Sequence, residues 1–299
     1  LFIIGLPRTG TTILHALLDV DTANRSPLFW EVEFPVPPAN PSTWLVDPRI
    51  AKNQKMLDQL DKICPGFNAV HPMAADMPQE CVAIFAYHMM SEHFHMTFNV
   101  PSYIEWLDDQ DMRPSYRLHK AFLQHLQSGG VKGKRWLLKS PCHLHLIDQL
   151  LDIYPDANII HTHRDPVSVC ASITSLAAML RGVGSDHIDT HAIARQQLDW
   201  WEKLLQRAVS QRKALEHKSA QFFDLKMSET VSDPLGSVER IYQHFNLPLG
   251  DDVKQQMLCY MQEHPRDKHG SHSYQPEDFG ISKDRDTERF REYIDYFGL

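Results

Sequence analysis

The stretch "LFIIGLPRTGTTILHALL" at residues 1–18 decides the fold. An apolar run ends at Gly5, a short loop follows, and apolar residues then recur at helical spacing, namely Ile13, Leu14, Leu17 and Leu18. Strand, loop and helix in this order form the context of a phosphate-binding loop, in which backbone N–H groups at a helix N-terminus face an anion. The stretch therefore predicts an α/β protein with an anion site after its first strand.

The loop departs from the nucleotide-binding consensus G-x-x-x-x-G-K-[ST] at one position. Gly5 and Gly10 keep the glycine spacing, but Thr11 replaces the lysine and the cation is Arg8, inside the loop. The strands predicted further along end in basic residues, so no acidic strand end is available for Mg²⁺. The loop favours an anion neutralised by side chains, and a glycine-rich turn without a ligand is the alternative.

The remaining chain alternates between strand and helix patterns. A short strand is predicted over 26–34, a proline-rich loop over 35–48 and mostly helix over 49–130. Strands are then predicted over 135–139, 157–164 and 220–227, and helices over 143–153, 167–180, 188–216, from 233 onward and over 285–297. This alternation predicts a single α/β domain over 1–299, with a mostly parallel central sheet flanked by helices.

Composition narrows the possible functions. The chain has 299 residues and a net charge of −8, which argues against a nucleic-acid binder. Five scattered cysteines predict neither a disulfide framework nor a zinc site and fit a reducing compartment, so we expect a cytoplasmic protein. No apolar run approaches the roughly 18 residues of a membrane span. Because the chain begins inside a strand, we expect that a native amino-terminal segment precedes Leu1.

Three cations follow three predicted strands. Arg8, Lys139 and Arg164 each stand at a strand end, and Ser172 lies two turns into the helix after Arg164. Ligands of open parallel sheets bind beyond the carboxyl ends of the strands. Gathering three cations at such an edge is costly unless an anion meets them. The sequence thus predicts a site for a strongly anionic ligand there.

These residues carry a resemblance to the sulfotransferases. "GLPRTGTT" resembles their 5′-phosphosulfate-binding loop, "HRDPVSVCAS" their 3′-phosphate motif and "LLKSP" the strand with their active-site lysine. "RDKHG" at 266–270 is similar to the loop that closes over the nucleotide. The proline-arginine form of the first motif is most similar to the bacterial and tyrosylprotein branches.

The resemblance implies 3′-phosphoadenosine 5′-phosphosulfate as donor and a metal-free transfer of the sulfuryl group to a hydroxyl or amine. Lys139 and Arg8 would act on the reacting group, and residues 35–130 would form an insertion on the acceptor side. A small molecule, a glycan or a peptide all remain open as acceptor, as does the oligomeric state. The resemblance assigns the 5′-phosphosulfate to Arg8, Thr9, Gly10, Thr11 and Thr12, the 3′-phosphate to Arg164 and Ser172, and closure by the 264–282 loop to Lys268 and Gly270.

Two departures from the family affect the expected chemistry. Ile13 replaces a tryptophan that stacks on adenine in the cytosolic enzymes, and Pro141 replaces their histidine base. An acceptor hydroxyl must still lose its proton, so another general base is expected. In the tyrosylprotein and heparan branches the base is a glutamate shortly after the first helix, which favours Glu31. The other candidates are His143, Glu33 and His145.

Eighteen histidines invite a metal interpretation, including the H-x-H pair of His161 and His163. No helical motif such as H-E-x-x-H accompanies them, so we expect no functional metal. Two other functions remain open. One is an ATP-dependent small-molecule kinase on the same scaffold, and the other is a catalytically inactive nucleotide-binding protein.

Overall fold

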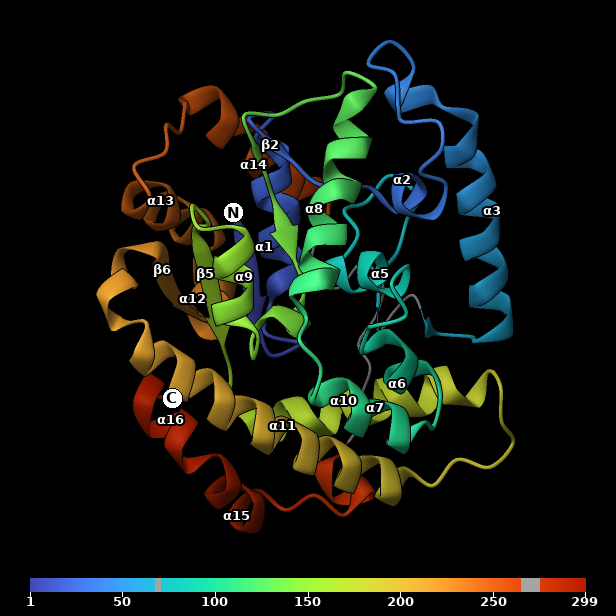
Figure 1. Ribbon diagram of the computed structural model, residues 1–299, viewed down its shortest axis with the longest axis vertical. Helices are drawn as coiled ribbons and strands as arrows, with labels where there is room; N and C mark the ends of the chain where they lie inside the picture. Colours follow the sequence, from blue (N-terminus) through green and yellow to red (C-terminus); the bar gives the residue numbers. More distant parts are fainter. Residues whose placement is uncertain (68–70, 265–274) are drawn as a thin grey trace.

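A central parallel sheet organises the chain in the computed structural model, which describes residues 1–67, 71–264 and 275–299. Its strand order is β4 (Leu138–Lys139), β1 (Phe2–Gly5), β5 (Ile159–His163) and β6 (Phe222–Lys226), and all neighbours are parallel. Figure 1 shows the sheet with helices around it, which confirms the predicted α/β architecture. Because Ile3 lies opposite Lys139 and Gly5 opposite Thr162, the ends of β1, β4 and β5 meet at one edge.

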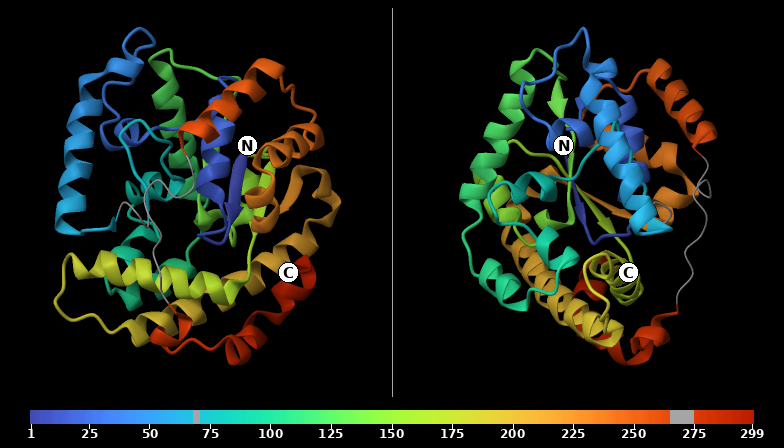
Figure 2. Two further views of the ribbon diagram at one scale, coloured as in Figure 1. Left: turned by 180° about the vertical axis from the view of Figure 1, so that it is seen from behind. Right: turned by 90° about the vertical axis from the view of Figure 1, so that its right-hand side faces the viewer.

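Helices cover both faces of the sheet, as alternating side chains require. Ile3 and Ile160 pack on one face against α1 (Thr11–Val20), α13 (Pro234–His244) and α14 (Asp251–Glu263). Phe2 and Ile4 pack on the other, in a core completed by α9 (Ile147–Ile153), α10 (Pro166–Gly182) and α11 (Thr190–Ala214). Figure 2 shows α10 and α11 lying across one end of the molecule.

Residues 29–128 form a second, helical part, as predicted for 49–130. Figure 1 shows α3 at the margin of the molecule, away from the sheet. The helices of this part are α2 (Phe29–Glu33), α3 (Pro48–Ile63), α5 (Cys81–Ala86), α6 (His93–Thr97), α7 (Pro101–Asp108) and α8 (Arg113–Ser128).

The strand predicted over 26–34 is wrong. A two-residue strand, β2 (Asn24–Arg25), pairs with β3 (Arg135–Trp136), and the chain then turns into α2. The loop carbonyls of Met77 and Ala75 accept the first N–H groups of this helix, and Glu31 accepts the N–H of Leu28 at 3.1 Å. Tertiary contacts thus override the strand propensity of this aromatic segment.

Other boundaries also differ from prediction. The strand expected over 135–139 is split between β3 and β4, which belong to different sheets. The helix expected over 143–153 begins as a 3₁₀ turn at Pro141–His143 before α9. The last helix is divided into α15 (Lys283–Asp286), a 3₁₀ turn and α16 (Arg291–Phe297).

Two further findings concern helices. α14 was not predicted, although Val253, Met257, Tyr260 and Met261 recur at helical spacing and pack against the core of one sheet face. Among the residues that the structure describes, no helix is both long and apolar enough to cross a membrane.

Candidate active site

The loop after β1 has a backbone that only particular residues can adopt. Gly5 has φ +135°, and a Cβ there would lie 2.4 Å from the carbonyl oxygen of Thr162 on β5. Arg8 has a positive φ of 63°, which is uncommon for a residue with a side chain. Gly10, at φ +80°, precedes the first turn of α1, where Thr11 and Thr12 lie. The first backbone N–H groups of α1 therefore begin directly after the loop.

Thr9 differs from the other loop residues because its hydroxyl faces the interior. The side chain is fully buried, and its Oγ1 lies 2.7 Å from the carbonyl oxygen of Leu6 and 2.7 Å from Thr162 Oγ1. Thr162 Oγ1 in turn lies 3.1 Å from the carbonyl oxygen of Ile4. The Thr9 side chain thus fixes the loop to β5, and only the backbone of Thr9 remains to meet a ligand.

The structure brings together three of the predicted anion-binding residues. Arg8 Nε donates a hydrogen bond to Ser172 Oγ at 3.3 Å. Arg164 Nη1 donates to the carbonyl oxygen of Arg8 at 2.8 Å. The two arginines and the serine therefore form one cluster at the shared edge of β1 and β5, although they are far apart in the sequence.

Lys139, at the end of β4, has an anionic partner that the sequence analysis missed. Its Nζ is buried and lies 2.7 Å from Glu80 Oε1, directly before α5. Burial alone would raise the pKa of Glu80, but the charge of Lys139, with a smaller effect of His71, lowers it below its usual value. Glu80 is thus a carboxylate that neutralises Lys139.

Lys139 and Glu80 face a cavity that has polar and apolar walls. His15 reaches it from α1, but its Nε2 lies 3.1 Å from Ser26 Oγ, so that ring is already held in place. His71 reaches the cavity from the loop that precedes α5. The lining is completed by Thr12, Ala16, Phe29, Pro72, Met77, Pro78 and Gln79.

Glu31, the favoured base, is placed elsewhere. Its carboxylate pairs with Arg25 at 2.7 Å, and both side chains are almost completely buried. Arg25 also stacks on Trp136, 4.6 Å from the ring centroid. Glu31 is not among the described residues that line the Lys139 cavity, and Glu33 is exposed on α2.

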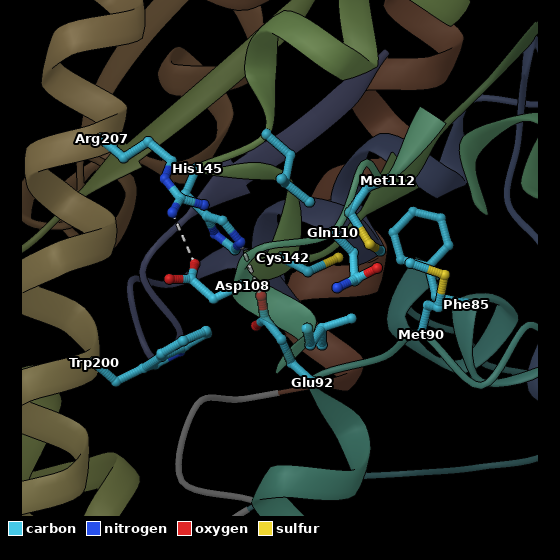
Figure 3. A pocket seen from close by; sticks show the side chains of 12 residues that line it. Phe85, Met90, Glu92, Asp108, Gln110, Met112, Cys142, His145, Trp200 and Arg207 are labelled. Atoms are coloured by element: carbon cyan, nitrogen blue, oxygen red, sulfur yellow. Dashed lines mark ion pairs between the residues drawn. The ribbon is translucent and has the colours of Figure 1, made fainter. Parts of the chain in front are cut away.

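The two histidine candidates are also not among the described residues that line the Lys139 cavity. His143 is fully buried, with Nδ1 2.8 Å from the hydroxyl of Tyr116, and burial holds its pKa well below the usual value. His145 lines a second cavity, where its Nε2 lies 3.3 Å from Glu92 Oε1. Figure 3 shows this pair, and Asp108 with Arg207, among apolar side chains.

Burial makes Glu92 and His145 a neutral pair. It raises the pKa of Glu92 to about 8, with a smaller effect of Asp108, and lowers the pKa of His145 to about 3. At neutral pH a protonated carboxyl therefore faces an uncharged imidazole. This arrangement differs from the ion pair of Lys139 and Glu80.

His161, His163 and Asp224 lie close enough for a metal site, since one ligand-type atom of each is within 4.8 Å of the others. The guanidinium of Arg212 occupies this cluster, donating to Asp224 Oδ1 at 2.8 Å and reaching His161 Nδ1 at 3.1 Å. The hydroxyl of Tyr293, on α16, lies 2.8 Å from His163 Nδ1. The cluster therefore docks the carboxy-terminal helix against β5. Lys268 and Gly270 lie outside the described residues.

Comparison with known proteins assigns the chain to a class. The sequence profile of the Sulfotransferase family matches residues 1–251, so the chain belongs to that family and is a transferase of the sulfotransferase type. This agrees with the motif order that suggested the resemblance.

Mycobacterial relatives agree with this assignment. The chain is 30% identical to sulfotransferase STF9 from Mycobacterium avium, with a TM-score of 0.86 over 100% of this chain and 76% of that one. It is 34% identical to STF1 from Mycobacterium tuberculosis, with a TM-score of 0.84 over 97% of this chain and 76% of the other. It is also 26% identical to the ω-hydroxy-β-dihydromenaquinone-9 sulfotransferase Stf3 of Mycobacterium bovis, over 100% of this chain and 74% of the relative.

Proposed function

We propose that this sulfotransferase uses 3′-phosphoadenosine 5′-phosphosulfate and transfers its sulfuryl group to a hydroxyl of a small molecule. The observation that carries the proposal is the meeting of Arg8, Arg164 and Ser172 at one sheet edge, with Lys139 on the adjoining strand. Arg164 and Ser172 would hold the 3′-phosphate. The N-terminus of α1 and Arg8 would hold the 5′-phosphosulfate.

In the proposed reaction the acceptor oxygen attacks sulfur as the bond between sulfur and the bridging oxygen breaks. The electron pair stays on that oxygen, and adenosine 3′,5′-bisphosphate leaves. Lys139 and Arg8 would stabilise the charge that develops there. Lys139 is paired with Glu80, so a bound donor would give it a second anionic partner.

The acceptor would enter beside Lys139, from the side formed by residues 35–130. The cavity there has the apolar side chains of Phe29 and Met77 together with polar groups, which suits a largely apolar molecule with one reactive hydroxyl. Stf3, by its name, acts on a hydroxylated menaquinone. We therefore propose a lipid-type alcohol as the acceptor class.

Glu31 is not retained as the proton acceptor in this proposal. Both of its oxygens are already used, one by Arg25 and the other by the N–H of Leu28. Protonation of Glu31 would leave Arg25 buried without its counterion.

Ligand-dependent thermal stability tests the donor. Adenosine 3′,5′-bisphosphate at about 100 times its Kd should stabilise the protein by roughly 2.7 kcal/mol, and ADP with Mg²⁺ should do so far less. Transfer from ³⁵S-labelled donor to ω-hydroxy-β-dihydromenaquinone-9, and to simpler alcohols and phenols, should persist in EDTA. A preference for ADP–Mg²⁺ would indicate a kinase. Bisphosphate binding without transfer to any acceptor would indicate an inactive nucleotide-binding protein.

A further inference from the structure

His71 is a titratable residue of the Lys139 cavity, and the reaction above does not use it. It lines the same cavity as Lys139 and Glu80, and it is partly exposed. The other histidine that lines this cavity, His15, is held by Ser26 and by a backbone hydrogen bond to Leu137. His71 is therefore the imidazole that is placed to meet an acceptor in this cavity.

We propose that His71 takes the proton of the acceptor hydroxyl when the donor is bound beside it. This inference rests on the proposed function and adds a proton acceptor to it. As the oxygen–sulfur bond forms, the hydroxyl proton passes to an imidazole nitrogen of His71, and the electron pair of the O–H bond remains on the oxygen. The resulting imidazolium would face the carboxylate of Glu80.

Glu80 itself is a weaker choice for this role. Its contact with Lys139 at 2.7 Å stabilises the charged form, and its pKa is below that of an ordinary carboxyl. General bases work best when their pKa lies near the working pH. An imidazole satisfies this better than a carboxylate whose pKa has been lowered, and Glu80 then serves as the counterion of the imidazolium.

The charges around His71 make its basicity depend on the donor. Burial lowers its pKa, Glu80 opposes that effect, and the positive charges of Lys139 and Arg8 lower the pKa further. An anionic donor would neutralise the charges of Lys139 and Arg8. The negative charge of Glu80 would then act on His71 without opposition from these cations. The pKa of His71 should therefore rise when the donor site is filled, so that the base becomes effective only in the donor complex.

Proton uptake on binding tests the donor-dependent part without any acceptor. Calorimetric titration with adenosine 3′,5′-bisphosphate near pH 6.5, in buffers of different ionisation enthalpy, should show net proton uptake by the wild type. His71→Gln should lose a substantial part of this uptake, whereas His217→Gln, which removes an exposed histidine, should retain it. Equal uptake in wild type and His71→Gln would overturn the inference. Absence of bisphosphate binding by the wild type would instead refute the proposed function.

Two further measurements keep the inference testable if His71→Gln is unstable. The ring resonance of His71 in the wild-type protein, assigned by its loss in His71→Asn, should titrate at higher pH with bisphosphate bound. A titration unchanged by bisphosphate contradicts the inference. With water as acceptor, sulfate release from the labelled donor should be about 10²-fold slower in His71→Gln or His71→Asn. Equal rates in the variants and the wild type would overturn the role of proton acceptor.

Discussion

Two glutamate–cation pairs in this protein have the same separation and different surroundings. Glu31 and Arg25 lie 2.7 Å apart, as do Glu80 and Lys139. The first pair is almost completely buried, Arg25 stacks on the ring of Trp136, and each partner has a further hydrogen bond to the backbone. The second pair faces a cavity that is also lined by Thr12, in the first turn of α1.

The difference separates a structural pair from one that we propose takes part in the reaction. Both carboxylate oxygens of Glu31 already accept hydrogen bonds, so protonation of Glu31 would break contacts that hold the fold together. Lys139 could contact a bound anion without a change in the core, and Glu80 could then form an ion pair with a different cation. The following substitutions test this distinction.

Replacement of Lys139 by methionine should have the largest effect. Turnover should fall by about 10³-fold, because removal of a group that stabilises charge in the transition state costs about 10²–10³. The affinity for adenosine 3′,5′-bisphosphate should fall by less than about tenfold, since Arg8 and Arg164 remain. Lys139→Arg, which keeps the charge, should recover part of the turnover. Near-normal turnover in Lys139→Met would mean that the Lys139–Glu80 pair, like the Arg25–Glu31 pair, has only a structural role.

Exchanging each glutamate for glutamine should give opposite results. Glu31→Gln leaves Arg25 buried without a counterion and should lower the free energy of unfolding by about 3–5 kcal/mol. The turnover of the folded fraction should stay within about threefold of wild type. Glu80→Gln should instead reduce turnover, and its loss of stability should be smaller than that of Glu31→Gln because Glu80 is partly exposed and faces a cavity. Denaturant unfolding and turnover, measured on the same samples, separate the two outcomes. A stable Glu31→Gln protein without activity would restore Glu31 as proton acceptor.

The meeting of Arg8, Arg164 and Ser172 could be predicted from the sequence because these residues have local signals. Arg8 and Arg164 each follow an apolar strand, and parallel strands bring their carboxyl ends to one edge. The motif around Lys139 belongs to the same pattern. Even there, the direction of the Thr9 side chain could not be predicted, because it depends on Thr162 of the neighbouring strand.

The acceptor side has no such local signal. Glu80 and His71 lie between α3 and α5 in the sequence, and they meet Lys139 at one cavity through tertiary folding alone. The position of Glu31 on α2 could not be predicted for a related reason. The aromatic segment around it has the residue pattern of a strand. Its helical structure depends on the contact between Glu31 and Arg25 and on the loop carbonyls that accept the first N–H groups of α2.

A third buried glutamate extends the comparison, because its partner is a neutral histidine. The pKa of Glu92 is raised by burial from 4.5 to about 8. Between these pH values the unfolded chain releases the proton and the folded protein keeps it, so stability falls as pH rises and the loss is complete above about 8. Glu92→Gln cannot ionise and should lack this loss. Between pH 5.5 and pH 8.5 the free energy of unfolding of Glu92→Gln should rise by about 2–3 kcal/mol relative to that of the wild type, as measured by urea unfolding at each pH. A constant difference across this range would mean that Glu92 is ionised in the folded protein.

The smallest expected effect comes from Arg25→Lys, which keeps the charge of the structural pair and removes its planar geometry. Lysine cannot reproduce the guanidinium contacts with the carbonyl oxygens of Val131 and Ser26 or the stacking on Trp136. The free energy of unfolding should fall by about 1–2 kcal/mol, less than in Glu31→Gln, because the ion pair itself survives. Turnover should be unchanged, in contrast to the corresponding exchange at Lys139. If Arg25→Lys lowered turnover without lowering stability, the pair would be coupled to the reaction, and the separation of the two pairs would no longer hold.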